Sequence, residues 1–357
     1  MKTKVLIVDD SAFMRKVLSD IINDSTTMEV VGTAKNGEDA IGKIESLNPD
    51  VVTLDVEMPV MDGLTALEKI MSETPLPVVM LSSYTKEGAD ATLKALELGA
   101  IDFISKPSSI FKVNTDDIIK EINEKIVTAS KVKFRKSLKR DGIKPTIKTP
   151  VTPSQPRRKR QIRGTKVEKI IAIGTSTGGP KALQEVVPKL PGDLNASVII
   201  VQHMPPKFTK SLAERLDGLS EMTVKEAEDR ELLKPGYAYI APGDQHLKIR
   251  RSGPDYQVML TKEPPVTGHR PSADAMYYSL ADLGLFNVIG VIMTGMGSDG
   301  AKGLERLKHE TNGFIIAQNE ETCVVYGMPK SAVRTGVVDR ECDLQHISNE
   351  IVKAMGV

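Results

Sequence analysis

The chain has no tryptophan, and only 4% of its 357 residues are aromatic. Proteins that stack nucleic-acid bases need exposed aromatic rings, so base stacking is not expected to be its main activity. There are two cysteines, Cys323 and Cys342, with no CxxC pair and no nearby histidine pattern. This argues against a disulfide scaffold and against a structural zinc site, and it fits a reducing compartment.

Long apolar runs are also missing from the chain. No run approaches the roughly 18 residues that a membrane-spanning helix needs. The N-terminal apolar run, residues 5–8, is too short for a signal peptide. We therefore expect a cytoplasmic protein with no membrane insertion. With about 150 residues in a typical domain, the length predicts two domains.

Charge divides the chain into three parts. The net charge is only +1, yet residues 131–170 hold 15 Lys or Arg and 2 Asp or Glu. This stretch is poor in apolar residues and cannot bury enough surface to fold alone. We predict a first domain at 1–125, a basic, proline-containing linker at 126–165 and a second domain at 166–357. The run PRRKR fits a phosphate-rich partner, but a solvated spacer is the simpler interpretation.

Short apolar runs alternate with amphipathic stretches in the first domain. The runs are KVLIV (4–8), MEVVGTA (28–34), VVTLD (51–55), PVVML (77–81) and IDFIS (101–105). Five βα units of this kind predict an α/β fold, in which helices cover both faces of a five-stranded parallel sheet.

The second domain repeats this pattern less regularly. Its strand candidates are residues 169–173, 197–202, 237–241, 246–250, 257–261, 287–293 and 313–317. Helices are expected to start near Pro180, Phe208, Ala273 and Ala301. These elements predict a doubly wound α/β domain with a mainly parallel sheet and an antiparallel excursion over 221–262.

Chemically active side chains follow four strands of the first domain. Asp9 and Asp10 follow the first, Asp55 ends the third, Ser82 follows the fourth and Lys106 follows the fifth. The carboxyl ends of parallel strands meet at one edge of the sheet. Three carboxylates there repel one another unless a cation is present, and Mg²⁺ suits hard oxygen ligands. A single strand-end aspartate is more often a helix cap, but the set predicts a site for magnesium and a phosphoryl group.

The motifs around these residues are VDD (8–10), LDVEMPVMDG (54–63), LSS (81–83) and SKP (105–107). Through them residues 1–125 resemble the response-regulator receiver family. The resemblance implies that Asp55 accepts a phosphoryl group from a histidine kinase. It also implies that Mg²⁺ binds to Asp10, Asp55 and the backbone carbonyl of Glu57, with help from Asp9.

The same resemblance assigns the remaining residues of the phosphorylation site. Ser82 and Lys106 would hold the phosphate, and Phe103 matches the switch aromatic of the family. Lys106–Pro107 matches a position where the family often has a cis peptide, which proline makes far less costly.

The stretch GTSTGGP (174–180) is the first chemical signal of the second domain. It satisfies G-x-S-x-G, which places Ser176 on a tight turn between a strand and a helix as a nucleophile. Gly178, Gly179 and Pro180 also open a helix whose N–H groups favour anions, so a phosphate-binding loop fits the motif equally well. A base and an orienting acid within reach of Ser176 decide between the two.

Two residues at other strand ends favour the nucleophile. His203 directly follows the strand 197–202, at the same edge as Ser176. A lone histidine there is more often structural, but Ser176 beside it makes His203 a candidate base, with His269 as its rival. Asp299 lies in a glycine-rich turn, where it either orients the imidazole or caps the following helix. Exposed N–H groups around Met296 are suited to hold an oxyanion.

The order Ser, His, Asp differs from the α/β-hydrolase order. The motifs are GTSTGGP (174–180), VQHMP (201–205), APGDQHL (241–247), GHRPSAD (268–274), MTGMGSDGA (293–301) and YGMPKSA (326–332). They resemble those of the chemotaxis-specific protein-glutamate methylesterases, and the resemblance covers essentially the whole chain, receiver and linker included. Thr175 stands where the family often has alanine.

This second resemblance implies Ser176 as nucleophile, His203 as base, Asp299 as its orienter and the Met296 N–H as an oxyanion donor, with Thr177 close by. The implied activity is a phosphorylation-activated hydrolysis of glutamyl methyl esters, with deamidation of glutamines, on methyl-accepting chemotaxis receptors. The implied phosphodonor is the chemotaxis histidine kinase. Mg²⁺ is implied only for the receiver, and the esterase reaction is expected to need no cofactor.

Two alternatives belong to other functional classes. A receiver-controlled DNA-binding regulator is favoured only by the basic linker, and the mildly acidic second domain has no helix-turn-helix pattern, so no nucleic-acid partner is expected. A nucleotide-binding scaffold could use GTSTGG, but that stretch lacks the lysine of a P-loop.

Overall fold

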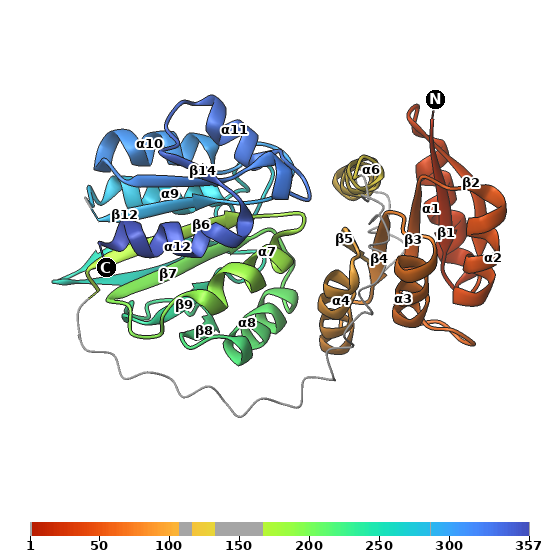
Figure 1. Ribbon diagram of the computed structural model, residues 1–357, viewed down its shortest axis with the longest axis horizontal. Coiled ribbons are helices and arrows are strands. Elements are labelled where there is room, and N and C mark those ends of the chain that lie inside the picture. Colours follow the sequence, from red (N-terminus) through yellow and green to blue (C-terminus); the bar gives the residue numbers. More distant parts are fainter. Residues whose placement is uncertain (1, 107–115, 133–166, 286, 357) are drawn as a thin grey trace, which may run out of the picture.

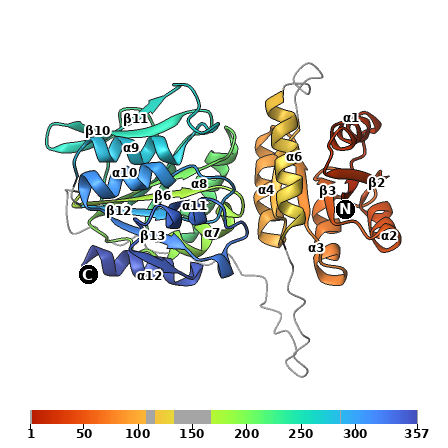
Figure 2. The same ribbon diagram turned by 90° about the horizontal axis from the view of Figure 1, so that it is seen from above.

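The computed structural model describes residues 2–106, 116–132, 167–285 and 287–356. They form two α/β domains that lie side by side (Figures 1 and 2). Most of the predicted linker, and the predicted cis peptide before Pro107, lie outside the described residues. In the described part of the chain, no helix combines the length and the apolar character that a membrane span requires.

The first domain is a five-stranded parallel sheet in the order β2-β1-β3-β4-β5. Its strands are β1 (Thr3–Val8), β2 (Met28–Ala34), β3 (Val51–Asp55), β4 (Val78–Ser82) and β5 (Asp102–Ser105). Its helices are α1 (Ala12–Asn23), α2 (Gly37–Leu47), α3 (Gly63–Glu73), α4 (Lys86–Leu98) and α6 (Asp116–Ser130). The predicted fold is confirmed, and the strand boundaries differ from the prediction by one residue at most.

Local sequence explains where the helices of this domain begin. Ser11, Asn36, Asp62 and Thr85 precede α1 to α4, and each side chain accepts a backbone N–H from the first helical turn. Such caps satisfy N–H groups that have no partner inside the helix. Every residue of β3 and β4 is buried, as expected for central strands covered by helices on both faces.

The second domain is built on a seven-stranded parallel sheet in the order β14-β13-β12-β6-β7-β9-β8. These strands are β6 (Lys169–Thr175), β7 (Ala196–Gln202), β8 (Thr223–Glu226), β9 (Tyr237–Ile240), β12 (Val288–Ile292), β13 (Phe314–Gln318) and β14 (Arg340–Cys342). The helices are α7 (Gly179–Val186), α8 (Phe208–Leu219), α9 (Ala273–Asp282), α10 (Ala301–Thr311), α11 (Met328–Arg334) and α12 (Leu344–Met355).

The antiparallel part of this domain is smaller than the predicted stretch 221–262. It consists of the separate pair β10 (His246–Ser252) and β11 (Asp255–Thr261), whereas β8 and β9 join the main sheet in parallel. The prediction missed β8 and β14. Both are short and carry charged residues, so their pairing depends on the neighbouring strand rather than on their own apolar pattern.

The domains meet through α4 of the first, which contacts α7 and α8 of the second. Figure 2 shows α4 and α6 on the side of the first domain that faces the second. At the centre of the contact, the ring of Phe103 stacks on that of Phe208, with 4.7 Å between the ring centroids. At the rim, the Arg215 guanidinium forms two hydrogen bonds with the Glu97 carboxylate, at 2.7 and 2.5 Å. The interface therefore combines an apolar centre with an exposed ion pair.

Candidate active site and phosphorylation site

Ser176 lies on the turn between β6 and α7. Its N–H donates to the Thr294 carbonyl at 3.0 Å, and its own carbonyl accepts the N–H of Gly179 at 2.8 Å. Only glycine fits at 179, because a Cβ there would lie 1.9 Å from the side-chain oxygen of Gln202. The close approach of strand and helix thus fixes the backbone of Ser176 at the carboxyl edge of the sheet.

Gln202 ties Ser176 to His203. Its buried side-chain amide donates to the carbonyls of Ser176, at 2.9 Å, and of His203, at 3.3 Å. The His203 N–H in turn donates to the Thr175 carbonyl at 3.2 Å. These bonds place the predicted nucleophile and the predicted base on adjacent strand ends. The sequence prediction missed Gln202, although a polar residue at the end of the fully buried β7 is a usable signal.

Asp299 completes the arrangement. Its Oδ2 lies 2.8 Å from Nε2 of His203. It also accepts the hydroxyls of Thr267 and Ser272, at 2.8 and 2.7 Å, and the N–H of Ala273 at 2.6 Å. The carboxylate therefore bonds to residues at the start of α9. It does not cap α10, which was the alternative role predicted for Asp299.

The surroundings of Asp299 keep it ionised. Burial by itself raises the pKa of this carboxyl, but the bonds from His203, Ser272 and Ala273 outweigh burial and hold the pKa well below its usual range. A permanently charged carboxylate on one nitrogen of an imidazole fixes the tautomer and stabilises the imidazolium. The other nitrogen of His203, Nδ1, is buried and has no hydrogen-bond partner in the described part of the chain.

The backbone around Gly295 and Met296 is a candidate oxyanion position beside Ser176. A Cβ at Gly295 would lie 2.8 Å from that of Ser176, so the backbone of this glycine-rich turn runs directly against the serine. The N–H of Met296 donates no hydrogen bond to the described part of the chain. An N–H without a partner at this place can donate to a negatively charged oxygen.

The first domain covers this site. The Thr177 hydroxyl donates to the Asp102 carboxylate at 2.5 Å, and the Thr128 hydroxyl on α6 contacts Sδ of Met296 at 3.0 Å. Asp102 and Thr128 were not predicted, because only the docking of the two domains brings them to the site. One contact involves the residue next to the candidate nucleophile, and the other involves the side chain of the candidate oxyanion donor, Met296.

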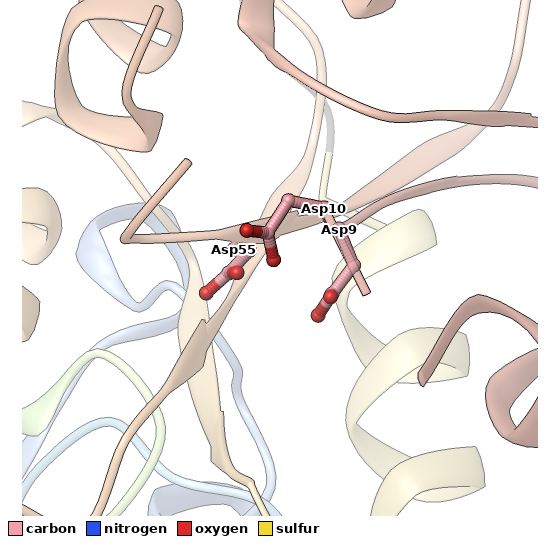
Figure 3. Close-up of side chains that lie close together, drawn as sticks. All are labelled: Asp9, Asp10 and Asp55. Carbon is pink, nitrogen blue, oxygen red and sulfur yellow. The ribbon is translucent and has the colours of Figure 1, made fainter. Parts of the chain in front are cut away.

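The second candidate site lies in the first domain. Figure 3 shows Asp9, Asp10 and Asp55 at the strand ends, and one carboxylate oxygen from each lies within 4.8 Å of the others. Nζ of Lys106 lies 2.9 Å from Asp9 and 2.6 Å from Asp55. Burial raises the pKa of Asp55 to about 6; the bond and charge of Lys106 oppose this rise, and the charge of Asp9 adds to it.

The donor set at this site fits magnesium. Lys106 pairs with two of the three carboxylates, and the Arg15 guanidinium donates to the backbone carbonyls of Asp9 and Asp10. All the candidate ligand atoms are hard oxygens. Ser82, predicted to hold the phosphate, bonds to helix α4 instead. Its hydroxyl donates to the Gly88 carbonyl at 3.0 Å and accepts a hydrogen bond from the Thr92 hydroxyl at 2.7 Å.

Residues 171–351 match the family model of the CheB methylesterase, and residues 5–120 match that of the response regulator receiver domain. A protein-glutamate methylesterase/protein-glutamine glutaminase of Halalkalibacterium halodurans is 50% identical over 99% of this chain and 98% of its own. The Bacillus subtilis protein of the same name is 45% identical over 97% and 96%. The crystal structure of the Thermotoga maritima CheB methylesterase catalytic domain matches 52% of this chain and 97% of its own, with 45% identity and a TM-score of 0.51. The chain therefore belongs to the CheB methylesterase family and carries an N-terminal response-regulator receiver domain.

Proposed function

We propose that this enzyme is a phosphorylation-activated serine hydrolase of bacterial chemotaxis. It removes methyl groups from glutamyl esters, and amide groups from glutamines, on methyl-accepting chemotaxis receptors. The observation that supports this best is the bonded pair of His203 and Asp299 beside the turn that carries Ser176. Family membership does not favour the DNA-binding and nucleotide-binding alternatives.

In the proposed reaction, the Ser176 hydroxyl oxygen attacks the side-chain carbonyl of a glutamyl methyl ester. His203 takes the serine proton, and the Met296 N–H donates to the oxyanion that forms. The intermediate then collapses, and His203 passes the proton to the leaving methanol. Water, deprotonated by His203, attacks the acyl carbonyl of the acyl-enzyme. The ester bond to Ser176 breaks, His203 returns the proton to the Ser176 oxygen, and the receptor side chain is left as glutamate. With glutamine as substrate, ammonia leaves in place of methanol.

The bond to Asp299 supports different roles for the two nitrogens of His203. Nε2 is bonded to Asp299, so Nδ1, buried and without a partner among the described residues, is the nitrogen that exchanges a proton with Ser176. In this tautomer the resting proton stays on Nε2, where the carboxylate accepts its hydrogen bond.

The receiver supplies the control. Asp10, Asp55 and the backbone carbonyl of Glu57, with Asp9, would hold Mg²⁺, which when bound neutralises charge during phosphoryl transfer. The Asp55 carboxylate accepts the phosphoryl group from a histidine kinase, and Lys106 pairs with it. Ser82 must leave its present bonds to α4 to reach the phosphate, which links phosphorylation to a change at the interface.

We also propose that the unphosphorylated receiver is an inhibitory lid. Asp102 on Thr177, Thr128 on Met296 and Phe103 on Phe208 support this, since all three contacts join the receiver to the vicinity of the reacting groups. A change from mostly closed to mostly open needs only a few kcal/mol of differential stability.

The proposed division of the chain is a receiver at 1–125, a basic linker at 126–165 and a catalytic domain at 166–357. Helix α6 continues to Ser130, so residues 126–130 of the proposed linker belong to this helix. We place the reaction in the cytoplasm, where a phosphorylated kinase and the receptor's signalling segments would both be within reach.

Ser176→Ala tests the reaction. It should lower methanol release from methylated receptor membranes by several orders of magnitude, as typical for loss of a catalytic triad member. Ser252→Ala, on the hairpin of β10 and β11, is the matched control and should behave as the parent protein. Circular dichroism should show both variants folded. Near-normal turnover by a folded Ser176→Ala protein would exclude the serine mechanism.

A further inference from the structure

His269 lies flat against the candidate base. The imidazole rings of His269 and His203 are stacked, with their centroids 3.9 Å apart and their planes within 13° of each other. The two histidines come from different parts of the domain, one from the end of β7 and the other from the loop that precedes α9. Two parallel rings at this distance are in van der Waals contact over most of their area.

The loop that carries His269 is firmly held. Val266 and His269 exchange two backbone hydrogen bonds, at 3.1 and 2.9 Å. The next residue, Arg270, donates from Nε to Asp244 at 2.9 Å and from its guanidinium to the Glu263 carbonyl at 3.0 Å. These bonds hold the backbone of the loop in place, so the His269 ring is a fixed flat surface for the ring beside it.

His203, by contrast, has few restraints of its own. Its ring makes one hydrogen bond, from Nε2 to Asp299, while Nδ1 has no partner in the described part of the chain. A single hydrogen bond does not by itself fix the tilt of the ring about the axis of that bond. Contact with a flat neighbour removes this freedom, and the direction of Nδ1 depends on it.

The stacked ring is neutral at ordinary working pH. Burial, with the charge of His203, lowers the pKa of His269 to about 4. The other charged groups that act on His269 are Asp299, on its own domain, and Glu121 and Lys125 on receiver helix α6. A neutral ring can stay in contact with His203 in both protonation states of the base, which a second cation would oppose.

We propose that His269 is a positioning residue for the esterase reaction. Its ring fixes the plane of His203, so that Nδ1 points at the Ser176 hydroxyl. It exchanges no proton with the substrate, and a flat apolar ring can replace it. This inference rests on the proposed role of His203 as the base.

The test compares His269→Ala, which removes the flat surface, with His269→Phe, which keeps a flat ring that cannot titrate. His203→Ala and the exposed His309→Ala on α10 serve as references. Methanol release by the full chain is measured over a range of receptor concentrations at a saturating small acyl phosphate. The phosphodonor is needed because His269 also faces α6, and a change in docking could mask a change in chemistry.

We expect His269→Ala to lower kcat about ten-fold with KM unchanged, because slight misplacement of a catalytic group can cost up to about a hundred-fold. His269→Phe should recover most of this loss, and His309→Ala should match the parent. A parent-like kcat for His269→Ala, a loss confined to KM, or a Phe variant as slow as the Ala variant would each overturn the inference. If His203→Ala stays active, the base assignment itself fails, so the two failures are distinguishable.

Discussion

Asp55 in the receiver and Asp299 in the catalytic domain invite comparison. Both are buried aspartates at the carboxyl edge of a parallel sheet, Asp55 as the last residue of β3 and Asp299 after β12, with 3% and 1% of their surface exposed. Yet the pKa of Asp55 is raised to about 6, mainly by burial, whereas the pKa of Asp299 lies far below its usual range. Position in the fold therefore does not decide the protonation state of such a residue.

The difference lies in the neighbours. Asp299 accepts bonds from the hydroxyls of Thr267 and Ser272, the N–H of Ala273 and the ring of His203. Asp55 has the Lys106 ammonium on one side, the carboxylate of Asp9 on the other and a long bond of 3.4 Å from the Glu57 N–H. The carboxylate of Asp299 is already satisfied, so it is suited to orient a histidine. The receiver carboxylate has unmet charge, so a cation and a phosphoryl group can stabilise it.

Replacing each aspartate by asparagine should give the largest contrast. Asp299→Asn should lower methanol release about 10⁴-fold, because the amide stabilises the wrong imidazole tautomer and no imidazolium. Asp55→Asn should keep basal activity and lose both phosphorylation and its stimulation. Mass spectrometry and the methanol assay measure the two effects. Equal loss of basal activity in both variants would contradict the separate roles of Asp299 in the reaction and Asp55 in its control.

Asp274 offers an intermediate case. It is buried next to Asp299 and accepts the Gly303 N–H at 2.6 Å, and burial, with the charge of Asp299, raises its pKa from 3.8 to about 6. The folded state therefore keeps this proton after the unfolded chain has lost it. Its contribution to stability is fully present below about pH 4 and is lost as the pH rises through about 6.

Asp274→Asn cannot titrate, so it should gain stability relative to the parent as the pH rises. A shift of about two pKa units corresponds to about 3 kcal/mol between pH 3.5 and pH 7. Urea unfolding of both proteins over this range measures the difference. A difference that does not change with pH would mean that the folded protein does not raise the pKa of Asp274.

Asp102 tests the contact between the two regions. Asp102→Ala leaves the buried Thr177 hydroxyl without its acceptor in the closed state, at a cost of about 1–2 kcal/mol. We expect unphosphorylated activity to rise about ten-fold. Asp102→Asn, which keeps an oxygen acceptor, should rise less, and the exposed Glu45→Ala on α2 should not change. If the Asp102→Ala protein has the basal activity of the parent, the bond between Asp102 and Thr177 does not contribute to inhibition.

The ion pair of Arg215 with Glu97 should have the smallest effect. The side chains are 48% and 25% exposed, and pairs at such exposure are worth about 0.2–1 kcal/mol. A double-mutant cycle with Arg215→Ala and Glu97→Ala should therefore change basal activity less than about five-fold. A larger coupling, insensitive to salt, would show that the rim of the interface and not Asp102 controls closure.

Much of the fold and the main site could be predicted from the sequence, because strand ends and tight turns are local features. The alternation of apolar runs locates β1 to β5, and a residue after a buried strand, such as His203, must lie at the carboxyl edge. The position of His269 relative to His203, the other candidate base, could not be predicted in this way. Stacking is a tertiary contact, so spacing gave no sign that the two rings lie together.

Contacts across the interface could not be predicted for the same reason. Asp102 and Thr177 are 75 positions apart and in different domains, and no pattern in either segment points to the other. The role of Gln202 was easier to predict, because a polar residue at the end of a buried apolar strand needs hydrogen-bond partners. β8 is missing from the prediction because four residues with two charges, TVKE, form a strand only beside β9.

We expect the receiver to cover a competent catalytic domain until Asp55 is phosphorylated. The most direct test is methanol release by a fragment from about residue 160 to residue 357 and by the full chain, at equal concentration, with and without a small acyl phosphate. We predict that the fragment is folded and faster than the unphosphorylated full chain, that the phosphodonor raises the full chain towards or beyond the fragment, and that it leaves the fragment unchanged. A fragment that is folded by circular dichroism yet no faster than the unphosphorylated full chain would contradict the claim and show that the receiver is not an inhibitory lid.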